Sequence, residues 1–438
     1  MTAVRRALEL CVFCPKMCRF ACPVSEATSR EAFTPWGKVS LAALSGRSPD
    51  ASAALAFGAC TGCLRCQTYC AHANDVPALL YAARATAVRA GSAPGAWGEV
   101  ARRMAAAGHA EEAELVEVYR RIAGDEAIPS WTSTPSSSPT WTSIPTSTPT
   151  PTSSPTPIST PTPTPISTPT AWGTPSRPRT SAVRAVAGAL TAMLRPAVEA
   201  GRKEPMLLAG CDALAAGGRV VREALAVARA VGAPLALAPE AALCCGLKLV
   251  EAGHPEMFAA HAARVRAALL GPSRRPAPVH LVLLAPGCAR AVREKWPALP
   301  DGSRVEHVSS YLSRALAARP DLRDRPPLAE SAAYHDPCEL ARGLSEVTAP
   351  RALLAAAVEE VREPLRCGAD TACCGANGLL PRTLPAAAEA IAADRRRELD
   401  ACGARAVTAS PECASALGAE DVVSVLARWL GVAVEQAR

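Results

Sequence analysis

Residues 244–253, CCGLKLVEAG, and residues 373–381, CCGANGLLP, each begin with two cysteines and a glycine, at the same step of two matching units. Each unit starts with a short apolar run and a single cysteine, and it ends with another apolar run and a last cysteine. The first cysteine and the pair are separated by 32 residues in one unit and 34 in the other, and the pair and the last cysteine by 42 and 38. This regular spacing indicates a duplication.

Short apolar runs bounded by turn residues predict the strands of the duplicated half. They are 206–210, 234–238, 279–285, 332–336 and 406–410. Segments with helical spacing lie between them, and one of these, 219–231, has its apolar residues on one face. Alternation of strands and helices predicts parallel strands joined by crossover helices. We therefore expect two α/β domains, at 181–320 and 321–438.

Each unit offers four cysteines to a metal. They are Cys211, Cys244, Cys245 and Cys288 in the first unit, and Cys338, Cys373, Cys374 and Cys413 in the second. His335 and Asp336 precede Cys338, where they either exchange protons near a metal group or orient the loop. Cys367 and Cys402 lie outside the repeated pattern, and a free cysteine of this kind often packs as a small apolar side chain.

The first 128 residues are rich in cysteine and prone to form helices, and they carry two dense cysteine runs. CVFCPKMCRFAC occupies 11–22 and CTGCLRCQTYC occupies 60–70. Their candidate ligands are Cys11, Cys14, Cys18, Cys22, Cys60, Cys63, Cys66 and Cys70. A structural zinc site takes two cysteines from each of two separated knuckles, which fits such dense runs poorly. The spacing resembles bacterial ferredoxins and predicts two [4Fe–4S] clusters. That resemblance implies that Cys70 completes the first set and Cys22 the second.

Residues 129–175 contain 13 of the 40 prolines and no charged residue, and are otherwise mostly Ser and Thr. Such a segment cannot bury enough apolar surface to fold, and its prolines oppose helix and sheet alike. We expect a disordered linker at 129–180 that acts as an extended tether, with a reach of roughly 3 Å per residue. A docking strip for a partner is the alternative interpretation.

The composition favours a reducing compartment. With 18 cysteines, an N-terminus lacking an apolar signal core and no long apolar stretch, the chain is expected to be cytoplasmic, with peripheral contact to the inner face of a membrane left open. The net charge of +7 is spread among acidic residues, so we expect no nucleic-acid partner. Clusters held by four thiolates, each carrying about two negative charges, would offset that excess.

The segments CCGLKLVEAG, CCGANGLLP and YHDPCEL (334–340), together with the ferredoxin-type runs, resemble a known group. The chain is similar to the heterodisulfide reductase catalytic subunit. It also resembles the iron–sulfur subunits of glycolate oxidase, lactate utilisation and anaerobic glycerol-3-phosphate dehydrogenase systems. The likeness covers nearly everything except the proline-rich segment. It implies a helical ferredoxin-type half, and two cysteine-rich α/β domains that hold one or two further clusters between strand ends.

The chain departs from that family at the end of each unit. The family motif ends in Cys-x-x-Cys, whereas this chain has alanine at positions 291 and 416. Heterodisulfide reductases are expected to hold an unusual non-cubane cluster with five thiolates, and four remain here. Four thiolates suffice for a cubane, and zinc in one unit stays open.

The resemblance implies an electron-transfer subunit of a flavin-linked oxidoreductase. The sequence shows no Gly-rich phosphate cradle, so the flavin is expected on a dehydrogenase partner. Electrons from a small organic substrate would then pass toward quinone or another acceptor. A second hypothesis is catalytic cleavage of a disulfide at Cys244/Cys245 and Cys373/Cys374. A third is a non-enzymatic redox-sensing metal scaffold.

Overall fold

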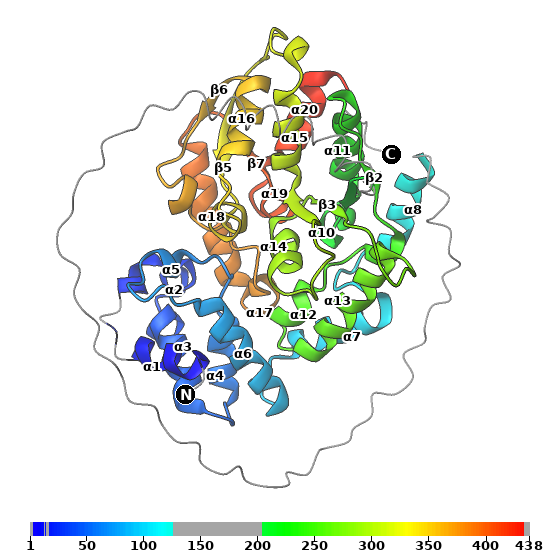
Figure 1. Ribbon diagram of the computed structural model, residues 1–438. Coiled ribbons are helices and arrows are strands. Elements are labelled where there is room, and N and C mark those ends of the chain that lie inside the picture. Colours follow the sequence, from blue (N-terminus) through cyan, green and yellow to red (C-terminus); the bar gives the residue numbers. More distant parts are fainter. Residues whose placement is uncertain (1–2, 13, 15–16, 126–203, 433–438) are drawn as a thin grey trace, which may run out of the picture. The chain divides into compact units, whose positions relative to one another are not determined.

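The computed structural model describes residues 3–12, 14, 17–125 and 204–432 (Figure 1). The described residues on both sides of the gap at 126–203 form one compact body. The predicted linker at 129–180 lies outside the described residues. The predicted helical half and the predicted α/β half can each be compared with the structure.

The N-terminal half is helical, as predicted. Its elements are α1 (Ala3–Val12), η1 (Met17–Ala21), α2 (Pro23–Thr28), η2 (Glu31–Phe33), α3 (Pro35–Ser45), α4 (Ala51–Gly58), α5 (Arg65–Thr68), α6 (Val76–Arg89), α7 (Gly95–Ala107) and α8 (Leu115–Asp125). The side chains of Thr34, Asp50 and Asp75 cap α3, α4 and α6 by accepting a backbone N–H from the first turn. These caps fix where the helices begin, and the cysteine loops fall between the helices.

Helix α8 packs through an apolar stripe of residues spaced three or four positions apart. Leu115, Tyr119 and Ile122 are buried, and the Tyr119 hydroxyl donates to the carbonyl of Ala238 at 2.8 Å. The stripe is therefore core, and it joins the N-terminal half to the first cysteine unit.

The C-terminal half contains two four-stranded parallel sheets. The first has β1 (Met206–Leu208), β2 (Ala236–Leu237), β3 (His280–Leu283) and β4 (Arg304–His307) in the order β2-β1-β3-β4. The second has β5 (Leu328–His335), β6 (Val358–Arg362), β7 (Arg405–Thr408) and β8 (Glu420–Asp421) in the order β6-β5-β7-β8. The identical strand order in the two sheets supports the duplication inferred from the cysteine spacing.

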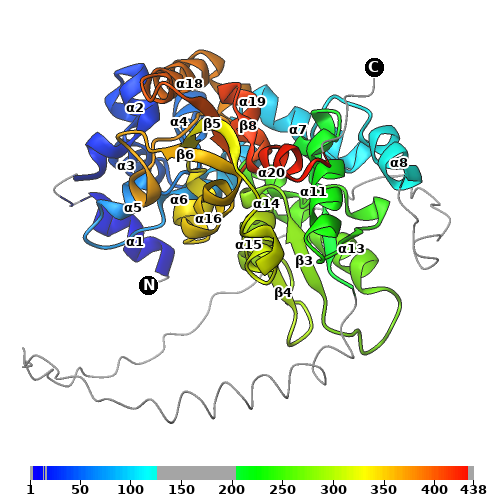
Figure 2. The ribbon, with the colours of Figure 1, turned by 90° about the horizontal axis from the view of Figure 1, so that it is seen from above.

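Helices cover these sheets and join them. The first unit contains α10 (Cys211–Ala215), α11 (Arg219–Ala230), η4 (Glu240–Ala242), α12 (Leu247–Glu251), α13 (Pro255–Leu270), α14 (Pro286–Glu294), α15 (Val308–Ala317) and η5 (Pro320–Leu322). The second contains the π-helix η6 (Glu339–Gly343), α16 (Thr348–Ala357), η7 (Gly368–Asp370), α17 (Leu380–Thr383), α18 (Pro385–Asp400), α19 (Pro411–Leu417) and α20 (Val422–Leu430). Helices α11 and α20 pack against each other between the two units (Figure 2). In the described part of the chain, no helix has both the length and the apolar content needed to cross a membrane.

Buried Arg84 of α6 connects the N-terminal half to both cysteine units through hydrogen bonds. Its side chain is fully buried, and its guanidinium donates to four backbone carbonyls. These belong to Phe57 (2.9 Å), Cys60 (3.1 Å), Glu251 (2.7 Å) and Gly378 (3.3 Å). Because the first two lie in the N-terminal half and the others in the two units, one side chain links all three parts.

Buried His307, at the end of β4, predicts a loss of stability in acid. Its Nε2 donates to the Leu284 carbonyl at 2.8 Å, and its Nδ1 accepts from the backbone N–H of Ser309. Burial lowers the pKa of His307 from 6.5 to about 4. Between these values the unfolded chain binds a proton that the folded chain does not, so the free energy of unfolding falls as pH falls, by roughly 1.4 kcal/mol per pH unit.

We expect His307→Asn to make the free energy of unfolding less sensitive to pH between 6.5 and 4.5. Denaturant unfolding of both proteins at several pH values measures this. The matched control is His72→Asn, at an exposed histidine, which should keep the parental pH dependence. If the free energy of unfolding depended on pH equally in the parent and in His307→Asn, His307 would not be the cause of the stability loss in acid.

Candidate metal centres

Four of the predicted ligand cysteines follow the central strands of the two sheets. Cys211 begins α10 after β1, and Cys288 lies in the first turn of α14 after β3. In the second unit Cys338 follows β5, and Cys413 lies in the first turn of α19 after β7. Because the carboxyl ends of neighbouring parallel strands lie at one edge of a sheet, each unit brings its first and last cysteines together there.

In the first unit the four cysteines are buried and form two hydrogen-bonded pairs. The thiols of Cys211 and Cys244 are hydrogen-bonded, with their sulfur atoms 3.8 Å apart. This hydrogen bond lowers the pKa of Cys244 well below its usual value, and the same bond together with burial raises that of Cys211. A hydrogen bond with Cys245 and burial likewise raise the pKa of Cys288. Cys244 is thus the cysteine of this unit whose thiolate is favoured.

The second unit repeats this arrangement. Cys374 and Cys413 have their sulfur atoms 3.2 Å apart, and the thiols of Cys338 and Cys373 are hydrogen-bonded. The bond from Cys338 lowers the pKa of Cys373, which corresponds to Cys244 of the first unit. All four are buried.

The glycine after each cysteine pair has a defined structural role. The N–H of Gly246 donates to the Cys244 sulfur, and the N–H of Gly375 donates to the Cys373 sulfur, both at 3.4 Å. Both glycines have a left-handed φ, of 83° and 82°. A Cβ on Gly375 would lie 2.6 Å from the Ala388 carbonyl oxygen. The Cys-Cys-Gly motif therefore turns a backbone donor onto the first sulfur of each pair.

The two N-terminal cysteine runs exchange their last members. Burial raises the pKa of Cys66 well above its usual value, and the charges of Cys63, Cys60 and Cys22 raise it further, which places Cys22 with the second run. The buried ammonium of Lys38 lies 3.4 Å from the Cys22 sulfur. This is the grouping that the ferredoxin resemblance implies, and ligation by these residues stays a prediction.

The other set lies nearer the surface. Burial first, and then the charges of Cys11, Cys14 and Cys70, raise the pKa of Cys18 to about 11. The side-chain amide of Asn74 donates to the Cys11 sulfur at 3.1 Å. Cys14, Cys18 and Cys70 are partly exposed, whereas all members of the set with Cys22 are buried.

The structure shows a contact between the N-terminal half and the second unit that the cysteine spacing does not predict. A hydrogen bond with Cys373, followed by burial, raises the pKa of Cys63 well above its usual value. Arg342 of the second unit donates to the Cys63 carbonyl at 2.6 Å, and Cys373 donates to the Thr61 hydroxyl at 3.5 Å. The buried N-terminal set therefore adjoins the second unit directly.

The two units enclose a cavity of about 520 Å³. All four cysteines of the first unit line it, together with Cys374 of the second. Burial raises the pKa of two lining carboxyl groups, to about 8 for Glu339 and about 7 for Glu412. The lining cation Lys248 pairs with Asp212 at 2.8 Å and with Glu111 at 2.6 Å. Sequence reasoning missed these charged residues, although Asp212, Glu339 and Glu412 are each next to a predicted ligand.

The two cysteines outside the repeated pattern stay outside these groups. The Cys402 thiol donates to the Glu398 carbonyl at 3.6 Å, and both Cys402 and Cys367 are partly exposed. His335, by contrast, comes close to Cys374 and Cys413.

The grouped thiols fit iron–sulfur chemistry. Soft thiolate ligands suit iron–sulfur clusters and zinc, and the structure brings cysteines from distant parts of the chain together, with backbone or side-chain donors at several of their sulfur atoms. A structural zinc site takes its cysteines from two knuckles, whereas the cysteines of the two units come from the ends of strands and from the Cys-Cys-Gly turns.

Comparisons with known proteins agree with this chemistry. Residues 332–418 match the family described as a cysteine-rich domain, CCG. The chain is 27% identical over 221 residues to one subunit of the dihydromethanophenazine:CoB--CoM heterodisulfide reductase of Methanosarcina barkeri, covering 46% of this chain and 53% of the relative. It is 26% identical over 250 residues to the subunit of the same name from Methanosarcina mazei, covering 51% and 58%. The chain thus spans about half the length of the curated relatives it matches.

Proposed function

We propose that this chain, which carries the CCG cysteine-rich domain and is similar to heterodisulfide reductase subunits, is the electron-transfer subunit of a flavin-linked oxidoreductase complex. The observation that carries the proposal is the continuity of its cysteine groups. The partly exposed group with Cys18 is followed by the buried group with Cys22, which adjoins the second unit through Cys63 and Cys373. The second unit in turn shares the cavity with the first.

Four groups of cysteines would hold the clusters. They are Cys11, Cys14, Cys18 and Cys70; Cys22, Cys60, Cys63 and Cys66; Cys338, Cys373, Cys374 and Cys413; and Cys211, Cys244, Cys245 and Cys288. Iron–sulfur clusters accept and release single electrons at potentials that depend on burial and on hydrogen bonds to sulfur. Lys38, Asn74, Gly246 and Gly375 provide such donors in this chain. A positive or N–H group at sulfur stabilises the added negative charge of a reduced state, so these residues would tune the potentials.

The proposed partners follow from the same arrangement. A flavoprotein dehydrogenase would deliver electrons from an organic substrate, and quinone or another acceptor would receive them. The partly exposed group with Cys14, Cys18 and Cys70 is the best placed of the four to exchange electrons with a partner, because electron transfer falls off steeply with distance.

Metal analysis tests the proposal. The full chain, purified without oxygen, should contain iron and acid-labile sulfide in equal amounts, at roughly 12 to 16 of each per chain. Three or four groups of four cysteines give this range. Zinc as the main metal, with little sulfide, would contradict the proposed function.

The cavity favours a second candidate function, the cleavage of a disulfide. It is large enough for a small ligand, and cysteines of both units line it. Two features weigh against an anionic disulfide as substrate. Lys248 and Arg382 are the cations among the described lining residues, and both pair with Glu111. The remaining ionisable groups of the lining are carboxyl or thiol groups.

An assay with a strong electron donor and a panel of disulfides separates the two functions. We expect the chain to be reduced and then to pass its electrons to a soluble quinone, while the disulfides stay intact. Catalytic production of free thiols would favour disulfide cleavage over electron transfer as the function.

A further inference from the structure

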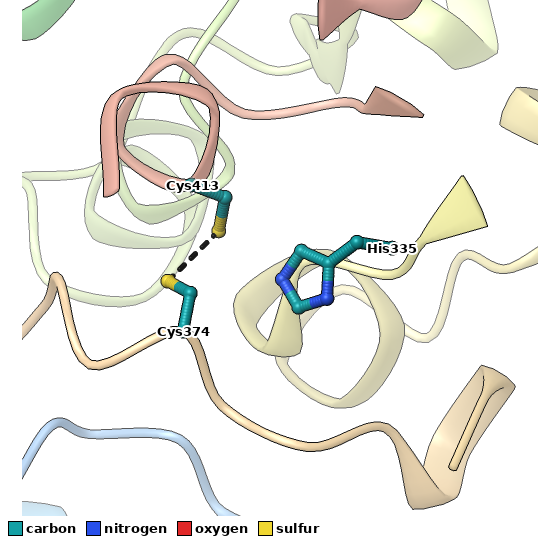
Figure 3. A group of neighbouring side chains, drawn as sticks. All are labelled: His335, Cys374 and Cys413. Carbon is teal, nitrogen blue, oxygen red and sulfur yellow. Dashed lines mark hydrogen bonds between the residues drawn. The ribbon is translucent and has the colours of Figure 1, made fainter. Parts of the chain in front are cut away.

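His335 is a fully buried polar group near the second cysteine unit to which the proposed function gives no role. It closes β5, and its Nε2 has no hydrogen-bond partner among the described residues. One of its ring nitrogens and the sulfur atoms of Cys374 and Cys413 all lie within 4.8 Å of one another. Figure 3 shows the imidazole edge with Nε2 facing the two sulfurs.

Arg395 determines which ring nitrogen of His335 carries the proton. Its Nε donates to the Nδ1 of His335 at 2.9 Å, and its Nη1 lies 2.8 Å from a carboxylate oxygen of Glu398. A guanidinium is always a donor and has no acceptor atom. Nδ1 must therefore accept this hydrogen bond, and the neutral imidazole must carry its hydrogen on Nε2.

This tautomer excludes the simplest role as a metal ligand. An Nε2 that carries hydrogen has no lone pair to offer, so ligation through it requires either an imidazolate or loss of the bond from Arg395. What the geometry provides is an N–H donor that points at two sulfur atoms. The strand end is held in place, because the Thr408 hydroxyl donates to the His335 carbonyl at 3.0 Å.

The first unit has no such donor at the equivalent position. His335 pairs in register with Thr408 at the ends of β5 and β7, just as Leu208 pairs with Leu283 at the ends of β1 and β3. Leu208 is apolar, so the duplicated units differ in hydrogen bonding at this point. The difference lies in the unit whose Cys373 contacts Cys63 of the buried N-terminal cysteine group.

We propose that His335 is a positioning residue whose Nε2–H donates to the sulfur atoms of Cys374 and Cys413 and raises the reduction potential of the cluster held in the second unit above the value it would otherwise have. This inference rests on the proposed function, which supplies the cluster. The donor stabilises the extra negative charge that a cluster gains on reduction, and it thereby makes this unit a better electron acceptor from the group with Cys22 and Cys63.

The test is an EPR-monitored redox titration of the full chain, with iron and sulfide measured on the same samples. His335→Leu should shift the midpoint potential of one cluster to a more negative value while iron and sulfide stay at the parental level. His335→Gln, which can accept from Arg395 and donate to sulfur, should restore much of the potential. His280→Asn, at a partly buried histidine that begins β3 in the first unit and bonds to Glu306, is the matched control and should leave all potentials unchanged.

Two results would overturn the inference. Unchanged potentials in His335→Leu would show that the donor has no effect, and loss of about one cluster of iron would make His335 a ligand. Because His335→Leu could fail to fold, pulsed EPR of the reduced parental protein gives an independent reading. We expect a weak nitrogen coupling and an exchangeable proton that disappears in D₂O, whereas a strong coupling of a directly bound nitrogen would overturn the inference. Parental protein without iron and sulfide would instead overturn the proposed function.

Discussion

Replacing Arg84 with methionine is expected to lower the free energy of unfolding by about 3 kcal/mol or more, the largest stability loss that we expect from a single substitution outside the cysteines. Four carbonyl groups accept from this buried guanidinium, and methionine would fill the space without satisfying them. Chemical unfolding of the full chain under anaerobic conditions measures the loss. The matched control is Arg89→Met, at an exposed arginine on the same helix, which should stay within about 0.5 kcal/mol of the parent.

The backbones of the three parts approach closely around Arg84. A Cβ on Gly378 would lie 2.1 Å from the Cys60 carbonyl oxygen, and a Cβ on Gly253 would lie 2.7 Å from the Arg84 carbonyl oxygen. Arg84→Lys keeps the charge but offers one donor atom in place of a planar fork, so we expect an intermediate loss. If Arg84→Met were as stable as Arg89→Met, the three parts would have to be held together by apolar packing alone.

The sequence predicted the central strands of both sheets and the edge strand β2, and it missed the edge strands β4, β6 and β8. Runs such as 279–285 are apolar because β1, β3, β5 and β7 lie inside a sheet. β6 is an edge strand whose sequence VEEVR has two exposed glutamates. β4, RVEH, is polar for another reason, because its buried Glu306 pairs with His280 and Arg314. An apolar-run criterion cannot find such strands, because their polar residues are either exposed at the sheet edge or paired with other side chains.

The candidate site also has a part that the sequence predicted and a part that it did not. Cysteine spacing located the groups, because ligands close in sequence or at the ends of repeated strands follow local rules. The contact of Cys63 with Cys373 joins residues 310 positions apart, and the bond of Arg395 to His335 joins residues 60 positions apart. Contacts at such separations depend on how whole elements pack, which a single sequence does not encode in a readable pattern. Arg84 and the exposed Arg89 lie on the same Ala-rich helix, and the sequence gives no signal of their different roles.

Ala416→Cys is expected to change the type of cluster in the second unit. Ala416 lies three residues after Cys413 on α19, so the two share a face of the helix, and Ala416 lines the cavity with Cys374. A thiol at 416 would give this unit the fifth ligand that the resembling family has. We expect Mössbauer and EPR spectra of the parent to contain cubane signals only, and those of Ala416→Cys to gain a new, non-cubane component.

The first unit should respond differently, because its equivalent alanine has no space. Ala291 is fully buried in α14, so Ala291→Cys should overpack the core, lowering the free energy of unfolding by about 1–3 kcal/mol with the spectra unchanged. Ala414→Cys, on α19 but away from the cavity lining, is the control for a thiol placed on the same helix. The prediction fails if the parent already shows non-cubane signals that vanish in Cys402→Ser. Since the Cys402 thiol is directed to the Glu398 carbonyl, we expect Cys402→Ser to leave the spectra unchanged.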